Sequence, residues 1–306
     1  MAGTVKIGVA LPHASWPDQD DAWPIERIVE YGIRAEELGF DSLWTNDHFF
    51  IELWGPRVPT GPEPIALLSY LAARTQRVQL GTLVVCAPLR SPGQLAREAK
   101  ALAALSGGRF ILGLGAGWHE PEFAAFGIPF DRLVSRFEEY VEALLALLAG
   151  GRVDYDGQYV QLRDAEVFGE ASPPVWIAAG KPRMLALTAK RAAGWNVGGP
   201  KEAFAEGRAT IREQEVAFGR PPGSVVASAN ATALLAEPAE AERLLAEHPP
   251  RMGGPAIGTE GLRALVEDWR AAGCDHLILH FSGMIWSSYG LEQLDLAAEA
   301  LGLRGR

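Results

Sequence analysis

Apolar residues in this chain fall into two alternating kinds of segment. Short runs have the length and β-branched content of buried strands, whereas longer stretches carry apolar residues three or four positions apart, as in amphipathic helices. Strands are predicted at 5–11, 42–45, 77–85, 109–114, 174–179, 194–197 and 276–281, and within 224–235. Helices are predicted at 25–38, 63–74, 92–105, 131–148, 182–192, 201–218, 239–246, 261–272 and 292–301.

Strand and helix alternate throughout, which is typical of a parallel sheet. About eight such units favour a closed (β/α)8 barrel over an open sheet. The helix at 131–148 and a hairpin at 155–160, with Asp156-Gly157 at its turn, predict an insertion after the fourth strand. No linker or low-complexity segment interrupts the pattern, so residues 1–306 are expected to form a single domain.

The amino-acid composition excludes some classes of binding partner. A formal net charge of −10 and the lack of a basic stripe argue against nucleic acid and against an anionic membrane surface. No apolar stretch approaches the length of a membrane span, and the first residues do not resemble a signal peptide. Cys86 and Cys274 are far apart and are expected to be free thiols. A soluble, cytoplasmic protein with a small-molecule substrate is therefore expected.

Histidines gather where a barrel enzyme places its site, at the carboxyl ends of the strands. Four of the six lie at or just beyond such an end, and any one alone could be an ordinary rim or core residue: His13, His48, His119 and His280. Asp47 precedes His48, directly after the predicted strand 42–45. The two side chains can accept, donate and carry protons, which favours an active site at this strand end.

Tryptophans show the same bias, since Trp16, Trp23, Trp54, Trp118 and Trp286 all follow predicted strands. Such a cluster favours a concave mouth that stacks on a planar apolar ligand. The alternative is a lid that packs on itself.

Glycines at 113, 115 and 117 suggest close approach of the backbone to something flat, or else only a tight turn. They do not form a dinucleotide fingerprint, because Trp118 and Glu120 occupy the positions where a third glycine would be needed.

A small-residue turn into a helix predicts an anion site, with backbone N–H groups and the helix dipole pointing at the ligand. It consists of Ala178, Ala179, Gly180, Lys181, Pro182, Arg183 and Met184. Arg183 could add a charge-assisted fork to a phosphate. The alternative is a plain turn with proline in the first helical turn.

Metal catalysis has little support. No HExxH motif or cysteine pair occurs, and the acidic residues near strand ends, Asp47, Glu120 and Glu122, are not paired at ligand spacing. No metal site is expected.

An ordered series of motifs between about residue 5 and residue 200 resembles the bacterial luciferase-like flavin and deazaflavin oxidoreductases. The motifs are Trp44-Thr45-Asn46-Asp47-His48, Leu80-Gly81-Thr82, Pro88-Leu89-Arg90-Ser91-Pro92, Gly108-Arg109-Phe110, the glycines leading to Trp118, Glu122-Phe123, Gly127-Ile128-Pro129-Phe130, Arg136 and Gly194-Trp195-Asn196. The resemblance implies a (β/α)8 barrel with an insertion after strand four and a planar ring across the strand ends. It also implies a non-prolyl cis bond near Leu83-Val84, behind that ring, and a cofactor phosphate at 179–184.

The resemblance also bears on the cofactor. An Asp-His pair at the second strand end is typical of the branch that uses the deazaflavin coenzyme F420, so F420 is favoured and FMN is the alternative. By resemblance, Asp47 contacts the ring, His48 faces the substrate as proton donor, and Cys86 touches the cofactor. Trp118 stands where sugar-phosphate dehydrogenase relatives carry a catalytic acid, which makes that substrate unlikely and leaves His48, His119 and Glu120 as candidate acid/base residues.

The expected function is hydride transfer between F420 and a small organic substrate, with His13, Trp54 and His280 in the substrate pocket, and Gly117 and Trp118 at the cofactor. The alternatives are an FMN-dependent monooxygenase and a non-catalytic flavin-binding relative; a metal-dependent hydrolase has little support. Relatives are commonly homodimers, so a homodimer is expected.

Overall fold

The computed structural model describes residues 4–12, 25–52, 57–247, 255–281 and 290–304. The strands are β1 (Lys6–Ala10), β2 (Ser42–Thr45), β3 (Phe50–Ile51), β4 (Val58–Pro59), β5 (Gln79–Thr82), β6 (Val85–Cys86), β7 (Phe110–Gly115), β8 (Arg152–Asp156), β9 (Gln161–Glu166), β10 (Val175–Ala178), β11 (Gly194–Val197), β12 (Val226–Leu234), β13 (Ala256–Ile257) and β14 (His276–His280). The helices are α1 (Ile25–Leu38), α2 (Pro64–Arg74), η1 (Ala87–Leu89), α3 (Pro92–Leu105), α4 (Glu120–Ala125), α5 (Leu133–Ala149), α6 (Pro182–Arg191), α7 (Lys201–Ala217), α8 (Pro238–Glu247), α9 (Gly258–Ala271) and α10 (Glu292–Leu301).

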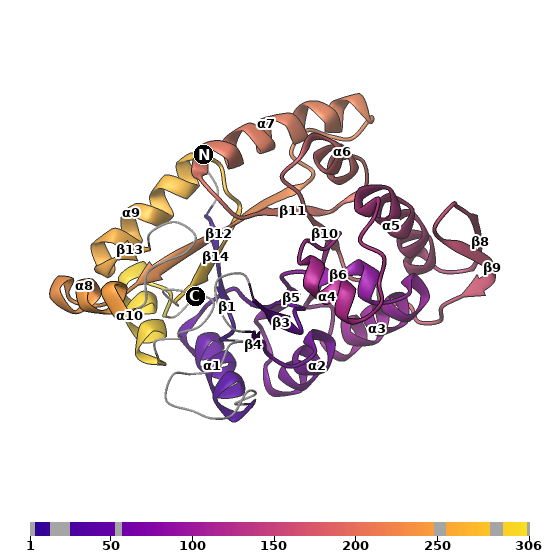
Figure 1. Cartoon of the computed structure of the whole chain (residues 1–306). Helices are drawn as coiled ribbons and strands as arrows, with labels where there is room; N and C mark the ends of the chain where they lie inside the picture. Colours follow the sequence, from indigo (N-terminus) through magenta and orange to yellow (C-terminus); the bar gives the residue numbers. More distant parts are fainter. Residues whose placement is uncertain (1–3, 13–24, 53–56, 248–254, 282–289, 305–306) are drawn as a thin grey trace.

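Eight parallel strands close into a barrel, which confirms the predicted (β/α)8 fold. Their order is β1-β2-β5-β7-β10-β11-β12-β14, and β14 pairs with β1 to complete the ring. The larger helices lie around this sheet (Figure 1). The predicted insertion after the fourth barrel strand is also present, as α4, α5 and the antiparallel β8–β9 hairpin.

Both faces of most barrel strands are buried, and β7, for example, is correspondingly an unbroken run of apolar residues and glycine. The outward residues form the main core with the helices; in β14 these are Leu277 and Leu279. The inward residues alternate with them and form a second, smaller cluster around Trp44, Trp176 and Ile278.

Two glycines make room for the indoles in the barrel interior. A Cβ at Gly81 would lie 2.2 Å from the Trp44 ring, and one at Gly194 would lie 2.4 Å from the Trp176 ring. The Trp44 indole N–H donates to Ser42 Oγ over 2.6 Å, and that oxygen lies 2.6 Å from His276 Nε2. Burial lowers the pKa of His276 to about 3, so this imidazole is neutral and shares a hydrogen bond with the Ser42 hydroxyl.

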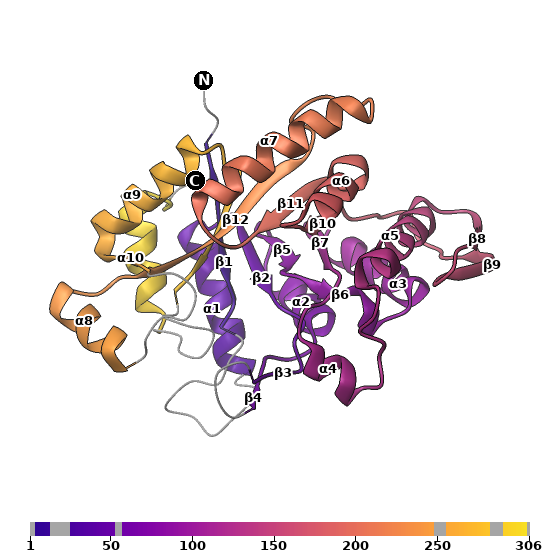
Figure 2. The ribbon, with the colours of Figure 1, turned by 45° about the horizontal axis from the view of Figure 1, so that its top comes forward.

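The structure differs from the predicted elements mainly on the carboxyl side of the barrel. The predicted strand 77–85 is divided into β5 and β6, and the short α4 and the β3–β4 pair were not predicted. Figure 2 shows α4 and the β3–β4 pair together at one end of the barrel. These additions surround the ends of β2, β5 and β7, where the sequence placed its candidate site. None of the described helices is long and apolar enough to cross a membrane.

Candidate active site

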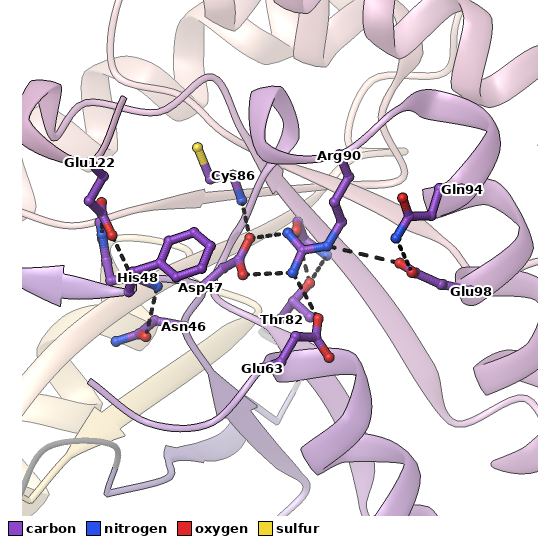
Figure 3. Close-up of polar contacts among 12 residues, drawn as sticks. Asn46, Asp47, His48, Glu63, Thr82, Cys86, Arg90, Gln94, Glu98 and Glu122 are labelled. Carbon is purple, nitrogen blue, oxygen red and sulfur yellow. Dashed lines mark hydrogen bonds and ion pairs between the residues drawn. The ribbon is translucent and has the colours of Figure 1, made fainter. Parts of the chain in front are cut away.

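Asp47, just beyond β2, is buried and fully engaged by protein donors. The Cys86 N–H donates to its Oδ2 over 2.9 Å, and the Arg90 guanidinium binds both carboxylate oxygens, with a distance of 2.8 Å at Oδ1 (Figure 3). Arg90 also donates to Glu63 over 2.7 Å. A bidentate fork of this kind fixes the carboxylate in the plane of the guanidinium.

Burial by itself would lower the pKa of Arg90, but the bonds to Asp47 and Glu63 outweigh it, and the pKa lies above its ordinary value. The guanidinium is therefore charged and neutralises the Asp47 carboxylate. Burial, together with that carboxylate, raises the pKa of the Cys86 thiol to about 12. Cys86 consequently presents a neutral thiol beside the site.

His48 points away from Asp47, toward α4. Its Nδ1 lies 2.8 Å from Glu122 Oε2, and the other Glu122 oxygen accepts the backbone N–H of Phe49 over 2.6 Å (Figure 3). Glu122 is 3% exposed, whereas a fifth of the His48 side chain remains accessible.

The charge of Glu122 decides the His48 tautomer. Burial alone would raise the pKa of Glu122, but the bonds from His48 and from the backbone N–H groups lower it below its ordinary value. An ionised carboxylate only accepts hydrogen bonds, so Nδ1 of His48 carries a proton and Nε2 is left for other partners.

The residues after β7 bring two more of the predicted side chains to His48. Trp118 is half exposed, with its ring 5.1 Å from the His48 ring and 5.2 Å from that of His119. His119 is buried, its Nε2 has no hydrogen-bond partner among the described residues, and burial lowers its pKa. Glu120, in the first turn of α4, is exposed; the carboxylate that meets His48 comes from Glu122.

The expected cis bond between Leu83 and Val84 is confirmed, and it interrupts the third barrel strand. The Thr82 side chain fills the gap in the β5–β7 ladder, because its Oγ1 donates to Gly113 O over 2.8 Å and accepts Gly113 N–H over 2.9 Å. Pairing resumes as β6, where Val85 pairs with Leu114. The resulting bulge lies at the level of the β2 end, since Thr45 pairs with Thr82.

The glycines at the end of β7 let this bulge approach. A Cβ at Gly113 would lie 2.0 Å from the Thr82 carbonyl oxygen, and one at Gly115 would lie 2.7 Å from Val84. Gly117 has φ +83°, and a Cβ there would meet the Phe123 ring at 2.3 Å and Cys86 Sγ at 3.0 Å. Within the described residues, these glycines serve close approach of the protein to itself.

The predicted anion site lies where β10 leads into α6. Lys181 is the N-cap residue but supplies no side-chain cap, and a Cβ at Gly180 would meet nothing within 4 Å. The first N–H groups of α6 therefore have no partner within the helix. The Arg183 guanidinium, expected at a phosphate, instead donates to Glu138 over 2.8 Å and to Ser135 over 3.1 Å, both on α5.

His280 ends β14, on another side of the barrel from His48, whereas His13 and Trp54 fall outside the described residues. No group of three or more His, Cys, Asp or Glu side chains in the described part of the chain could hold a metal ion.

Sequence reasoning did not assign roles to Arg90 and Glu122, the two residues that hold Asp47 and His48. Each belonged to a motif of the resemblance, and each has a largely buried charged side chain. Such a residue requires a partner of opposite charge when it is buried. That requirement was the available signal, although it does not say which partner is used.

Comparison with known proteins gives the family. A model of the luciferase-like monooxygenase family matches residues 5–273. Over 161 residues the chain is 37% identical to the F420-dependent glucose-6-phosphate dehydrogenase of Amycolatopsis mediterranei (strain U-32), a match that covers 51% of this chain and 48% of that protein. The chain thus matches about half the length of such curated relatives.

Solved structures resemble nearly the whole chain. The monooxygenase RslO1 from Streptomyces bottropensis superimposes with a TM-score of 0.81 at 25% identity, over 97% of this chain and 98% of that one. An F420-dependent secondary alcohol dehydrogenase, solved in complex with an F420-acetone adduct, gives 0.83 over 99% and 100% of the two chains. At 17% identity, the second likeness shows the fold alone.

Proposed function

We propose, since this chain belongs to the luciferase-like monooxygenase family, that it is a coenzyme F420-dependent oxidoreductase acting on a small organic substrate. The observation that carries the proposal is the position of Asp47-His48 beside the Leu83–Val84 bulge, at the same level of two adjacent barrel strands. The relatives named F420-dependent glucose-6-phosphate dehydrogenase, at 33–37% identity, support the deazaflavin over FMN.

The residues present fit such a cofactor. The uncapped start of α6, with open space at Gly180 and the exposed Lys181 beside it, suits an anionic phosphate group. Leu83 and Val84 suit one face of an apolar ring, with Asp47, Cys86, Gly117 and Trp118 near its edge. When bound, F420 supplies the hydride-transfer chemistry, which protein side chains do not provide.

The chain's own part in the reaction is to hold and exchange a proton. His48 commits Nδ1–H to Glu122, which leaves Nε2 as the atom that can exchange a proton with a substrate oxygen. His119 and Glu120 remain candidates for this role, but His119 is buried and Glu120 has no described contact with His48. His13, Trp54 and His280 are proposed to face the substrate.

A pair of fluorescence titrations tests the cofactor, one with F420 and one with FMN. Micromolar binding of F420 and much weaker binding of FMN are expected. Tighter binding of FMN than of F420, together with oxygen consumption, would favour an FMN-dependent monooxygenase. This is the second candidate function, and the likeness to the monooxygenase RslO1 supports it. Binding of neither would leave the non-catalytic alternative.

His48→Ala tests the proton donor. F420 affinity should be kept, because His48 contributes little to the apolar ring site, whereas turnover should be lost. Unchanged turnover would remove His48 from the mechanism. The homodimer expected by resemblance and the cytoplasmic location expected from composition stay predictions, which ultracentrifugation and cell fractionation would check.

A further inference from the structure

The barrel interior changes from aromatic to polar toward its carboxyl end. Trp44, Trp176 and Ile278 fill the middle of the interior. Above them, the inward positions of β11, β12 and β14 carry Asn196, Asn230 and His280 instead of apolar residues. Their inward direction follows from alternation, because Trp195, Ala229 and Leu279 belong to the outer core.

Asn230 is held in place by a second amide. Asn196 Nδ2 donates to Asn230 Oδ1 and Asn230 Nδ2 donates to Asn196 Oδ1, each over 3.2 Å. Asn196 uses its other N–H on Ser228 Oγ at 2.8 Å and is 4% exposed. The Asn230 amide, which is only partly buried, keeps one N–H and one oxygen lone pair beyond these bonds.

His280 lies one inward position further toward the mouth, on the neighbouring strand. The register pairs Asn230 with Ile278 and Thr232 with His280. Burial inside the barrel lowers the pKa of His280 to about 4, so the imidazole is neutral at pH 7. It therefore offers one N–H and one lone pair, and no charge.

These polar groups face the apolar bulge across the barrel. In the ring of eight strands, β12 stands four places from β5, on the opposite side. With the cofactor ring against Leu83 and Val84, a substrate lying between the two sides would meet the other face of that ring on one side and neutral hydrogen-bonding groups on the other. This arrangement suits a molecule with a hydrocarbon body and one uncharged oxygen function.

Among the described residues, the arginines beside the end of β2 are paired with carboxylates, and the exposed Lys181 at the end of β10 belongs to the proposed phosphate site. Arg90 binds Asp47 and Glu63, and Arg57 lies 3.0 Å from Glu52. The segments 13–24, 53–56 and 282–289, which follow β1, β3 and β14 in the sequence, contain no lysine or arginine, whereas the segment 248–254 after α8 contains Arg251. An anionic substrate would thus be desolvated without a paired charge, which is strongly unfavourable.

Building on the proposed function, we propose that Asn230 and His280 form the subsite for the oxygen atom of an uncharged alcohol or carbonyl substrate, and that Asn196 positions Asn230. The site then rejects phosphorylated substrates. In this it differs from the relatives named F420-dependent glucose-6-phosphate dehydrogenase, whose sequences match about half of this chain. His48 on the β2 side and this subsite on the β12–β14 side address the substrate from different directions.

The test measures substrate binding separately from turnover. The protein saturated with F420 is titrated calorimetrically with cyclohexanol, 2-butanol and cyclohexanone, and with glucose 6-phosphate and glycerol 3-phosphate. We expect at least one neutral probe to bind at least tenfold more tightly than either phosphate ester. Asn230→Ala should weaken that neutral probe about tenfold, while F420 affinity stays within twofold of the wild type.

Gln161→Ala is the matched control, because it removes an exposed amide from the outer hairpin strand β9. It should change neither affinity. Tighter binding of a phosphate ester, failure of every neutral probe, or unchanged probe affinity in Asn230→Ala would overturn the subsite. Failure of the wild-type protein to bind F420 would overturn the proposed function, and this subsite with it.

Discussion

Glu122→Gln is the most informative single change, because it removes one charge from a buried position without changing the size of the side chain. Glu122 currently uses one oxygen for His48 Nδ1–H, at 2.8 Å, and the other for the Phe49 N–H, at 2.6 Å. A glutamine must turn an NH2 group toward one of these two donors. Either choice breaks a bond and removes the charge that fixes the His48 tautomer.

The size of the effect follows from the kind of bond that is lost. A hydrogen bond to a charged group contributes about 1.5–3 kcal/mol. If His48 exchanges its proton through Nε2, the loss of this hydrogen bond raises the activation free energy of the proton transfer. About 1.4 kcal/mol of activation free energy corresponds to a tenfold change in rate. We therefore expect kcat to fall roughly 10- to 150-fold, with F420 affinity unchanged.

A double-mutant cycle separates this effect from a merely structural one. In the His48→Ala background, Glu122→Gln should have almost no further effect on the residual turnover, because the two residues act as a unit. Additive losses, or wild-type turnover in Glu122→Gln, would refute the reasoning. Glu213→Gln is the control, because it changes an exposed glutamate on the outer helix α7, and it should leave turnover near that of the wild type.

Stability gives a second readout with a defined sign. The pKa of Glu122 is lower in the folded protein than its ordinary value. Its contribution is therefore present above the unfolded pKa, about 4.3, and is lost as the pH falls through the lower folded pKa. Urea unfolding should show Glu122→Gln to be about 1–3 kcal/mol less stable at pH 7. The difference should shrink below pH ~4.3, and a constant difference would contradict the linkage.

Three further variants and one control variant test other parts of the site. Arg90→Met leaves the Asp47 carboxylate buried without its partner, and urea unfolding should show a loss of about 3–5 kcal/mol; a loss near zero would mean that the pair is not formed. Gly117 has φ +83°, and Gly117→Ala would place a Cβ 2.3 Å from the Phe123 ring. This variant should lower the free energy of unfolding by about 1–3 kcal/mol. Gly180→Ala is the control, because its Cβ would meet nothing within 4 Å, and it should leave the free energy of unfolding unchanged. Gly180→Asp puts a carboxylate at the start of α6 and should weaken F420 in a fluorescence titration about tenfold without loss of stability; unchanged affinity would move the phosphate elsewhere.

The barrel itself could be predicted from the sequence because its signals are local. Strands with both faces buried are continuous apolar runs, and the predicted bounds of β2, β11 and α10 agree with the structure. The short α4 was not predicted, because Glu120–Ala125 is too brief for a helical period to appear. The break between β5 and β6 was expected only by resemblance; nothing in the composition of Leu83 and Val84 distinguishes them from ordinary strand residues.

The site could be predicted only as a region. Residues at carboxyl strand ends of a barrel must gather at one end, so Asp47, His48 and His119 were named from their positions alone. Their partners could not be named, because Glu122 is 74 residues from His48 and Arg90 is 43 from Asp47. Contacts over such separations depend on the direction in which each side chain leaves the backbone. In the loops beyond the strand ends, the periodicity of the sequence does not reveal that direction.

Asp47 and His48 illustrate why those directions matter. The two residues are adjacent just beyond β2, and their side chains leave the chain on opposite sides. Asp47 ties the strand end to Arg90 before α3, and His48 ties it to Glu122 on α4. Each tie uses a buried charge, which is costly unless its partner is held firmly. These two ion pairs therefore fix the end of β2 from both sides. Both oxygens of Asp47 and the Nδ1 of His48 are bound within them, which leaves Nε2 of His48 as the atom that can exchange a proton.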